Sequence, residues 1–242
     1  MTFRLLVVSA VLALPVGAFA SVGKVSVLEG GGHRRGADGK AQPLAVGGDI
    51  ELGDTISLEA RSNAKLTLTD ASELCLGESS ELRIDEAEFQ GQERKGFSAR
   101  LTLGKFWAHV SKALSGNQAK FEVKAARAVA GVRGTIFRID ATPMVSKTYP
   151  PPIKKTVVRV TEGKVAVVAE VKRASAAPPP TPGRHQVPGP AQITAEAWEE
   201  KFTELQKNQQ VTVGDSSFDQ TTFDPSEKDA FSRFVERSTA HP

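Results

Sequence analysis

Cysteine is almost absent from this sequence, since Cys75 is the only one among 242 residues. A single thiol excludes an intrachain disulfide framework and a multi-cysteine zinc or iron–sulfur site. The four histidines are isolated and lack the spacing of metal ligands. We therefore expect no metal centre and no cofactor. Cys75 lies between Leu74 and Leu76 in an alternating run, which predicts a small buried or half-buried hydrophobe rather than a nucleophile.

Long apolar runs are also scarce, and the one clear example lies at the N-terminus. It extends over 12 residues from Leu5 to Val16, follows a short basic start, and precedes small residues at Ala18 and Ala20. This layout predicts a secretory signal peptide over residues 1–20 that is cleaved after Ala20. No later stretch approaches the ~20 apolar residues needed to span a bilayer. The sequence thus predicts a mature chain without a transmembrane segment, exported to the periplasm or the extracellular space.

A strong excess of one charge is missing as well. Lys and Arg number 31 and Asp and Glu number 28; removal of Arg4 with the leader gives 31 − 1 = 30 basic residues and a net charge of +2. A dedicated nucleic-acid-binding protein shows basic residues well in excess of acidic ones. Nucleic acid is therefore not an expected partner.

Catalytic motifs are absent too. The sequence contains neither a Gly-x-Ser-x-Gly nucleophile elbow nor a phosphate-binding loop of the Gly-x-x-x-x-Gly-Lys-Ser/Thr type. No catalytic residue is predicted, and a non-enzymatic protein is favoured. An enzyme with an unrecognised site is the least favoured alternative.

Residues 21–172 alternate between apolar and polar residues in short runs. Leu66 and Leu68 fall on one face of such a run, with Lys65 and Thr67 on the other. Runs of strand length recur roughly every 8–12 residues, and Gly or Asp occupies the intervening turns. This pattern predicts an all-β domain, built either as an antiparallel sandwich or as a β-solenoid of short strands.

Two further segments follow the β domain. Residues 173–190 are rich in proline, which predicts an extended linker. Residues 191–242 predict a short helical tail that packs either on the β domain or on a partner. A first helix is indicated after Thr194 by an apolar stripe that consists of Ile193, Trp198, Phe202 and Leu205. A second helix is indicated by Asp224 as N-cap and Pro225 at the first helical position, with an apolar face of Phe231, Phe234 and Val235.

Four blocks of the sequence closely resemble one known family, the FecR domain, which is named after the periplasmic sensor of iron-dicitrate uptake. The blocks cover residues 46–56, 64–72, 130–137 and 160–165. Their order and spacing resemble the family over residues 23–168, and the most specific signature consists of Gly131, Val132, Arg133, Gly134 and Thr135. The resemblance implies an all-β extracytoplasmic domain with no known catalytic activity.

The sequence departs from the family pattern in two places. Iron-sensing members carry a cytoplasmic anti-sigma segment and a transmembrane helix before the domain, whereas a cleavable leader is predicted here, so direct control of a sigma factor is not implied. The usual Asp-Gly-Ser turn is Asp70-Ala71-Ser72 in this chain. Ala71 is therefore expected to adopt a different turn type or to carry slight strain.

The signature itself allows two interpretations. Gly131 and Gly134 indicate positive φ or a close backbone approach on either side of Arg133. In the favoured interpretation Arg133 fixes the register of the β stack by pairing with an acid such as Asp54, Asp70 or Glu162. In the alternative it binds a carboxylate or phosphate of a ligand.

The expected function is a sensing, scaffold or protein-binding role in the bacterial cell envelope. A protein partner is expected to bind strand edges, a loop, or the aromatic tail. The candidate partner-binding residues are Tyr149, Trp198, Phe202, Phe231 and Phe234. The alternative partner is a cell-wall or capsular glycan, for which Trp107 is the candidate binding residue.

Overall fold

The computed structural model describes residues 21–111, 120–132, 134–143, 154–172 and 198–240. The predicted signal peptide and the proline-rich linker lie outside these ranges. The strands are β1 (Gly23–Glu29), β2 (Gly32–Arg35), β3 (Ala41–Pro43), β4 (Asp49–Ile50), β5 (Thr55–Leu58), β6 (Asn63–Leu68), β7 (Glu73–Leu76), β8 (Glu81–Gln90), β9 (Glu93–His109), β10 (Lys120–Ala125), β11 (Val129–Val132), β12 (Ile136–Pro143), β13 (Lys154–Glu162), β14 (Val165–Lys172), β15 (Trp198–Leu205), β16 (Gln209–Val213) and β17 (Phe218–Thr222). One helix, α1 (Ala230–Thr239), follows them in the described chain.

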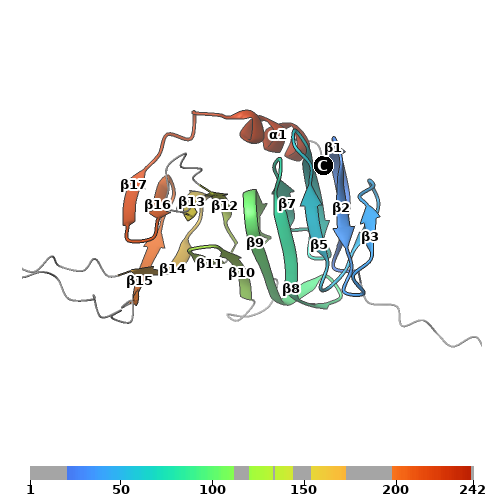
Figure 1. The fold of residues 1–242 in the computed structure, drawn as a ribbon, viewed down its shortest axis with the longest axis horizontal. Coiled ribbons are helices and arrows are strands. Elements are labelled where there is room, and N and C mark those ends of the chain that lie inside the picture. Colours follow the sequence, from blue (N-terminus) through green and yellow to red (C-terminus); the bar gives the residue numbers. More distant parts are fainter. Residues whose placement is uncertain (1–20, 112–119, 133, 144–153, 173–197, 241–242) are drawn as a thin grey trace, which may run out of the picture.

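The strands form one hydrogen-bonded network that divides into two sheets. Sheet A has the order β4-β1-β6-β7-β9-β12-β13-β16-β17. Sheet B has the order β3-β2-β5-β8-β9-β10-β11-β14-β15. Strands from the start of the chain lie at one end of the molecule, and β15, β16 and β17 lie at the other (Figure 1).

Strand β9 belongs to both sheets and changes sheet at Gly104. Residues 96–101 pair with β10 in sheet B, and residues 106–109 pair with β7 and β12 in sheet A. Gly104 has φ of 99°, and a Cβ at this position would lie 2.5 Å from the Cα of Ser80. Glycine is therefore required at this corner by both conformation and space. Within the described chain, β9 makes the only strand pairings that connect β1–β8 with β10–β17.

The core lies between the two sheets and follows the alternation seen in the sequence. Phe97 and Phe121 stack within sheet B with ring centroids 4.7 Å apart. Phe121 also meets Phe137 of sheet A edge to face at 6.4 Å, so the sheets contact each other through aromatic side chains. Leu66 and Leu68 are buried as their face of the run requires. One continuous apolar core therefore holds both layers together.

The predicted all-β fold is confirmed. Strand pairs in the described residues are antiparallel, except for the parallel pair of β9 and β10. A β-solenoid stacks its strands in parallel, so the pairing pattern fits the sandwich and not the solenoid.

The first predicted tail helix is wrong. Trp198 to Leu205 form strand β15, which pairs with all eight residues of β14. Strands β16 and β17 then extend sheet A. The stripe that suggested a helix does not face one surface, because Leu205 is buried in the core while Phe202 is 67% exposed. Pairing along the open edge of β14 outweighs the local helical pattern.

The second predicted helix is present but begins later. Its N-cap is Asp229, whose carboxylate accepts a hydrogen bond of 2.9 Å from the backbone N–H of Ser232. The predicted N-cap, Asp224, instead closes a turn by accepting from the N–H of Ser226 at 2.8 Å. The predicted apolar face is confirmed, because the buried residues of α1 are Phe231, Phe234 and Val235.

The turn between β6 and β7 places Ala71 in the left-handed region, with φ of 61°. Its N–H donates to the carbonyl of Leu68 at 3.0 Å, and the Asp70 side chain accepts from the N–H of Ser72 at 3.0 Å. Ala71 thus occupies a conformation that favours glycine, which is the second of the two outcomes expected for this turn.

Replacement of Ala71 by glycine is expected to stabilise the fold. The left-handed conformation costs an L-residue about 1 kcal/mol, and glycine does not carry this cost. We expect Ala71→Gly to raise the free energy of unfolding by about that amount, measured by urea denaturation. An unchanged or lower stability would show that the turn is not strained.

Candidate functional site

Helix α1 lies across the outer face of sheet A and covers a small apolar cluster. Phe231, Phe234 and Val235 pack against Cys75 of β7, with Val27 and Trp107 at the margin. Gly77 leaves room for the helix, since a Cβ there would approach the Phe231 ring to 3.1 Å. Ten residues are too few for a stable isolated helix, so α1 depends on this packing.

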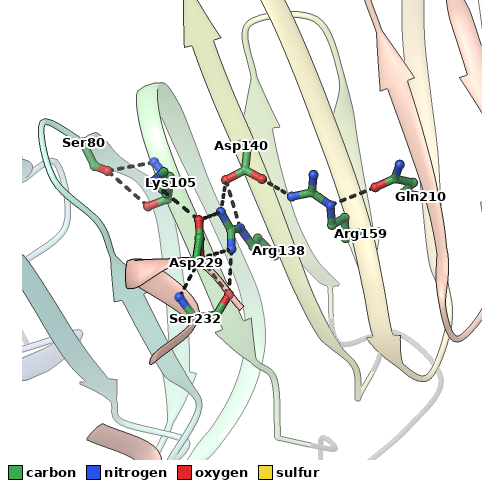
Figure 2. Close-up of polar contacts among 8 residues, drawn as sticks. All are labelled: Ser80, Lys105, Arg138, Asp140, Arg159, Gln210, Asp229 and Ser232. Atoms are coloured by element: carbon green, nitrogen blue, oxygen red, sulfur yellow. Dashed lines mark hydrogen bonds and ion pairs between the residues drawn. The ribbon is translucent and has the colours of Figure 1, made fainter. Parts of the chain in front are cut away.

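Arg138 of β12 anchors the N-terminus of α1 (Figure 2). Its guanidinium donates to both carboxylate oxygens of Asp229, at 2.9 and 2.8 Å, and to the Ser232 hydroxyl at 2.9 Å. Lys105 lies 3.6 Å from the same carboxylate, and Phe231 contacts the guanidinium with its ring centroid 5.2 Å away. The paired fork is the strongest geometry available to arginine and carboxylate. We call this arrangement the helix clamp.

The polar network continues away from the helix along sheet A (Figure 2). Asp140 accepts from Nε of Arg138 at 2.9 Å and also pairs with Arg159 of β13. Arg159 donates from its own Nε to the side-chain oxygen of Gln210 at 2.8 Å. Charges therefore alternate in sign from Asp229 to Arg159 across three elements.

The C-terminal end of α1 has its own contacts with sheet A. Lys65 is only 6% exposed and donates to the carbonyl of Ser238 at 2.8 Å and to Glu73 at 2.6 Å. Arg237 pairs with Glu29 of β1 at 3.2 Å. A cation at the C-terminus and a carboxylate at the N-terminus both favour the helix dipole.

The clamp makes the docking of α1 sensitive to acid. The Arg138 guanidinium holds the pKa of Asp229 well below its usual range, helped by the Ser232 N–H and opposed by burial. A carboxyl with a depressed folded-state pKa stabilises the folded state above its unfolded pKa of about 3.9, and this contribution is lost as the pH falls through the folded value.

We expect the emission of Trp107 to shift to longer wavelength as the pH falls below about 4, because helix docking weakens. The measurement uses a Trp198→Phe background so that Trp107 is the only indole. Asp229→Asn keeps an N-cap but removes the titrating charge, and it should flatten this part of the profile. An identical profile in Asp229→Asn would show that another carboxyl controls the transition.

A groove of about 1120 Å³ lies beside the clamp on the outer face of sheet A. Residues of β9, β12, β13 and β16 line the groove from sheet A. Residues 222–229 and α1 line its opposite side. Trp107, Val157 and Phe223 give it apolar surface, whereas Lys155 and Glu227 give it charge. A groove of this size and mixed character fits a peptide segment better than a small ligand.

The ionisable groups around the groove are largely engaged with one another. Asp140 and Asp229 each bond to an arginine, which leaves neither carboxylate placed as a general acid or base. In the described part of the chain, no group of three or more His, Cys, Asp or Glu residues could hold a metal ion. The arrangement is suited to holding α1 in place and to binding a ligand that has both polar and apolar groups.

The described part of the signature lies beside a second turn. Gly134 has φ of 60°, as predicted. The Thr135 hydroxyl donates to the carbonyl of Lys164 at 3.0 Å and so ties the turn before β12 to the turn before β14. The close approach predicted at Gly131 is absent, because the nearest atom to a Cβ there would be 3.9 Å away. Val132 is buried in the core.

Several predicted site residues lie partly or wholly outside the described structure. These are Arg133, Tyr149 and the side chain of Trp198. Of the acids proposed for Arg133, Asp54 pairs with Arg34 at 3.0 Å and Asp70 pairs with Arg94.

Among the remaining candidates, Phe231 and Phe234 lie on the face of α1 that packs against sheet A, so they are buried and not available to a partner in this structure. The tail therefore docks on its own β domain. Phe202 is exposed on β15, far in sequence from α1. Trp107 is half-buried and lines the groove. Phe202 on sheet B, Trp107 in the groove on sheet A and the buried pair on α1 therefore do not form one surface.

Sequence reasoning missed the buried arginine of this fold. Arg94 is 2% exposed and bonds to Asp70, to the Ser72 hydroxyl at 3.1 Å and to the carbonyl of Ser111 at 3.2 Å. The ring of Phe121 lies 5.2 Å from the guanidinium. Burial lowers the pKa of Arg94, and Asp70 opposes this change. Glu93-Arg94-Lys95 resembles an exposed hairpin in the sequence, so no local signal marked the residue.

The chain was compared with known protein families, curated sequences and solved structures. Residues 54–166 match the family model described as FecR protein. Two crystal structures of a putative anti-sigma factor from Parabacteroides distasonis ATCC 8503 are similar, each with 17% identity and a TM-score of 0.46. The similarity covers 70% of this chain and 60% of that chain. No curated protein sequence matches the chain.

Proposed function

Residues 54–166 form a FecR domain, and from this premise we propose that the protein is an exported, non-enzymatic sensing module that binds a protein partner in the bacterial cell envelope. The groove between sheet A and residues 222–229 is the observation that carries the proposal. In the described residues, no helix is both long enough and apolar enough to cross a membrane. Export rests on the leader-like residues 1–20.

The groove suits an extended or helical segment of a partner. Its volume exceeds the roughly 300–1,000 Å³ of most small-molecule sites. Trp107 and Phe223 supply aromatic surface, and Arg159 remains 30% exposed at the side chain. Aromatic residues and arginine are the types enriched where proteins bind one another.

Occupation of the groove is linked to the position of α1. Residues 222–229 line the groove and lead directly into the helix through Asp229. A partner that contacts this segment and sheet A together changes the free energy of helix docking, and helix docking changes partner affinity by the same factor. This linkage is how the module would convert binding into a signal.

A photo-crosslinking experiment tests the proposal. A benzophenone amino acid is placed at Thr222, which lines the groove, or at the neighbouring Thr221, which does not; both residues are exposed on β17. We expect a discrete protein adduct in the envelope fraction from Thr222 and none from Thr221. Equal labelling at both positions would reject the groove as a protein-binding site. Sequencing of the purified protein from the same fraction should begin at Ser21, and an intact Met1 would reject cleavage.

A glycan ligand is the second candidate, favoured by the half-exposed indole of Trp107 in the groove. It predicts that the protein sediments with purified wall polymer and that Trp107 emission changes on addition of the polymer. Sedimentation without any protein adduct at Thr222 would favour this function over protein binding.

A further inference from the structure

The two sheets have four edge strands in the described chain, and one of them differs from the rest. Strands β4, β3 and β17 have two, three and five residues, and β3 ends in Pro43. Strand β15 has eight residues and pairs with β14 without a register shift. Short strands, prolines and bulges protect sheet edges from pairing with other chains. Strand β15 has none of these features.

The outward side of β15 is apolar at its centre. Phe202 is 67% exposed and lies opposite Val168, which is half-buried on the same face of sheet B. Val129 of β11 continues this face beside Val168. A large exposed aromatic on a long edge strand offers both backbone groups and side-chain contact to an added strand.

The charge of this edge selects the kind of segment that fits. Glu200 of β15 lies directly opposite Glu170 of β14, and neither has an ion-pair partner in the described structure. Like charges opposite each other destabilise a sheet unless a cation is supplied. The strand carries three glutamates and one lysine, Lys201, which already pairs with Glu199 at 2.6 Å. A second copy would bring the same acidic strand, so self-pairing is disfavoured.

We infer that β15 is a strand-addition site for an extended basic segment of a partner protein. The added strand places a lysine or arginine beside Glu200 and an apolar side chain beside Phe202, two residues away on the same face. Its backbone forms hydrogen bonds along the side of β15 that pairs with no other strand in the described residues. This surface belongs to sheet B and is separate from the groove on sheet A. A negative binding test at one site therefore leaves the proposal for the other site unaffected.

The test measures binding of two fluorescein-labelled octapeptides to the full chain by fluorescence anisotropy at low ionic strength. One peptide repeats Thr-Lys-Thr-Val, and the other replaces each Lys by Glu. We expect the Lys peptide to bind at least ~tenfold more tightly than the Glu peptide, a difference of about 1.4 kcal/mol. Glu200→Lys should reverse this preference, and Phe202→Thr should weaken binding of the Lys peptide.

The Glu200→Lys variant also distinguishes a loss of peptide binding caused by the charge change from a loss caused by misfolding. Glu200→Lys removes the opposition to Glu170, so its melting temperature should equal or exceed that of the wild type while it loses the Lys peptide. Glu88→Lys makes the same charge change at an exposed position of β8, which β9, β10, β11 and β14 separate from β15 in sheet B, and should leave the preference unchanged.

Three results would overturn the inference. One is no binding of the Lys peptide, and another is an equal affinity for both peptides in the wild type. The third is a dimer in sedimentation velocity that Phe202→Thr dissociates, which would assign the edge to a second copy of this chain.

Discussion

Removal of residues 223–242 is expected to convert Cys75 from an inert thiol into a reactive one. Cys75 is fully buried beneath α1, and burial raises the pKa of its thiol to about 12. Loss of the helix should return the pKa toward 9.0, which increases the thiolate fraction near pH 8 by roughly three orders of magnitude. Thiolates of lower pKa are weaker nucleophiles, so ionisation alone should accelerate the reaction ~30-fold, and steric access adds to this.

The rate is measured with a chromogenic disulfide reagent on the native protein. Phe234→Ala should give a smaller increase than the deletion, because it removes a ring that is 1% exposed but leaves the clamp in place. Arg233 lies on the exposed side of α1, so Arg233→Ala serves as the matched control. We expect its thiol to react at the same rate as that of the wild type. A deletion variant with an unreactive thiol would show that sheet A shields Cys75 without the helix.

Replacement of Arg94 by alanine is expected to cost about 3–5 kcal/mol of unfolding free energy. The side chain of its partner Asp70 is only 6% exposed, so the variant leaves a buried carboxylate without its cation. The Ser111 carbonyl and the Ser72 hydroxyl also lose a donor. For a chain of this size the melting temperature should fall by about 10 °C, measured by circular dichroism.

A matched control separates burial from charge. Arg83→Ala removes an arginine whose side chain is 57% exposed and pairs with Asp85 at 3.3 Å, and we expect a change within about 0.5 kcal/mol. The double variant Arg94→Met with Asp70→Asn removes both charges and should recover part of the loss. A small effect of Arg94→Ala, comparable to that of Arg83→Ala, would contradict a stabilising role for the buried pair.

The all-β fold could be predicted from the sequence because the alternation of apolar and polar residues is a local pattern. Alternation in runs such as Leu66 and Leu68 requires only that one side of a strand faces the core. The left-handed position of Ala71 was one of two outcomes expected from the sequence, since Ala71 stands where the family has glycine. The sandwich could not be separated from a solenoid, because strand direction depends on pairing between distant segments.

The candidate site was not accessible, because its contacts join distant residues. Arg138 and Asp229 are 91 positions apart, and nothing near either residue identifies the other. The helix start was misplaced because Asp224 and Pro225 carry local capping signals, whereas the N-cap is fixed at Asp229 by its contact with β12. The error at Phe202 has a related cause: an exposed aromatic on an edge strand was interpreted as part of a buried helical stripe.

The sharing of β9 between the sheets has a consequence for amide hydrogen exchange. Its backbone hydrogen bonds to β7 and β8 on one side and to β10 and β12 on the other. Strand β9 can leave the sheets only when its pairings with both halves of the molecule break, so we expect its amides to exchange through global unfolding. Amides of β17 and α1 lie at the margin and open locally. The slowest amides should therefore trace one strand across the corner at Gly104.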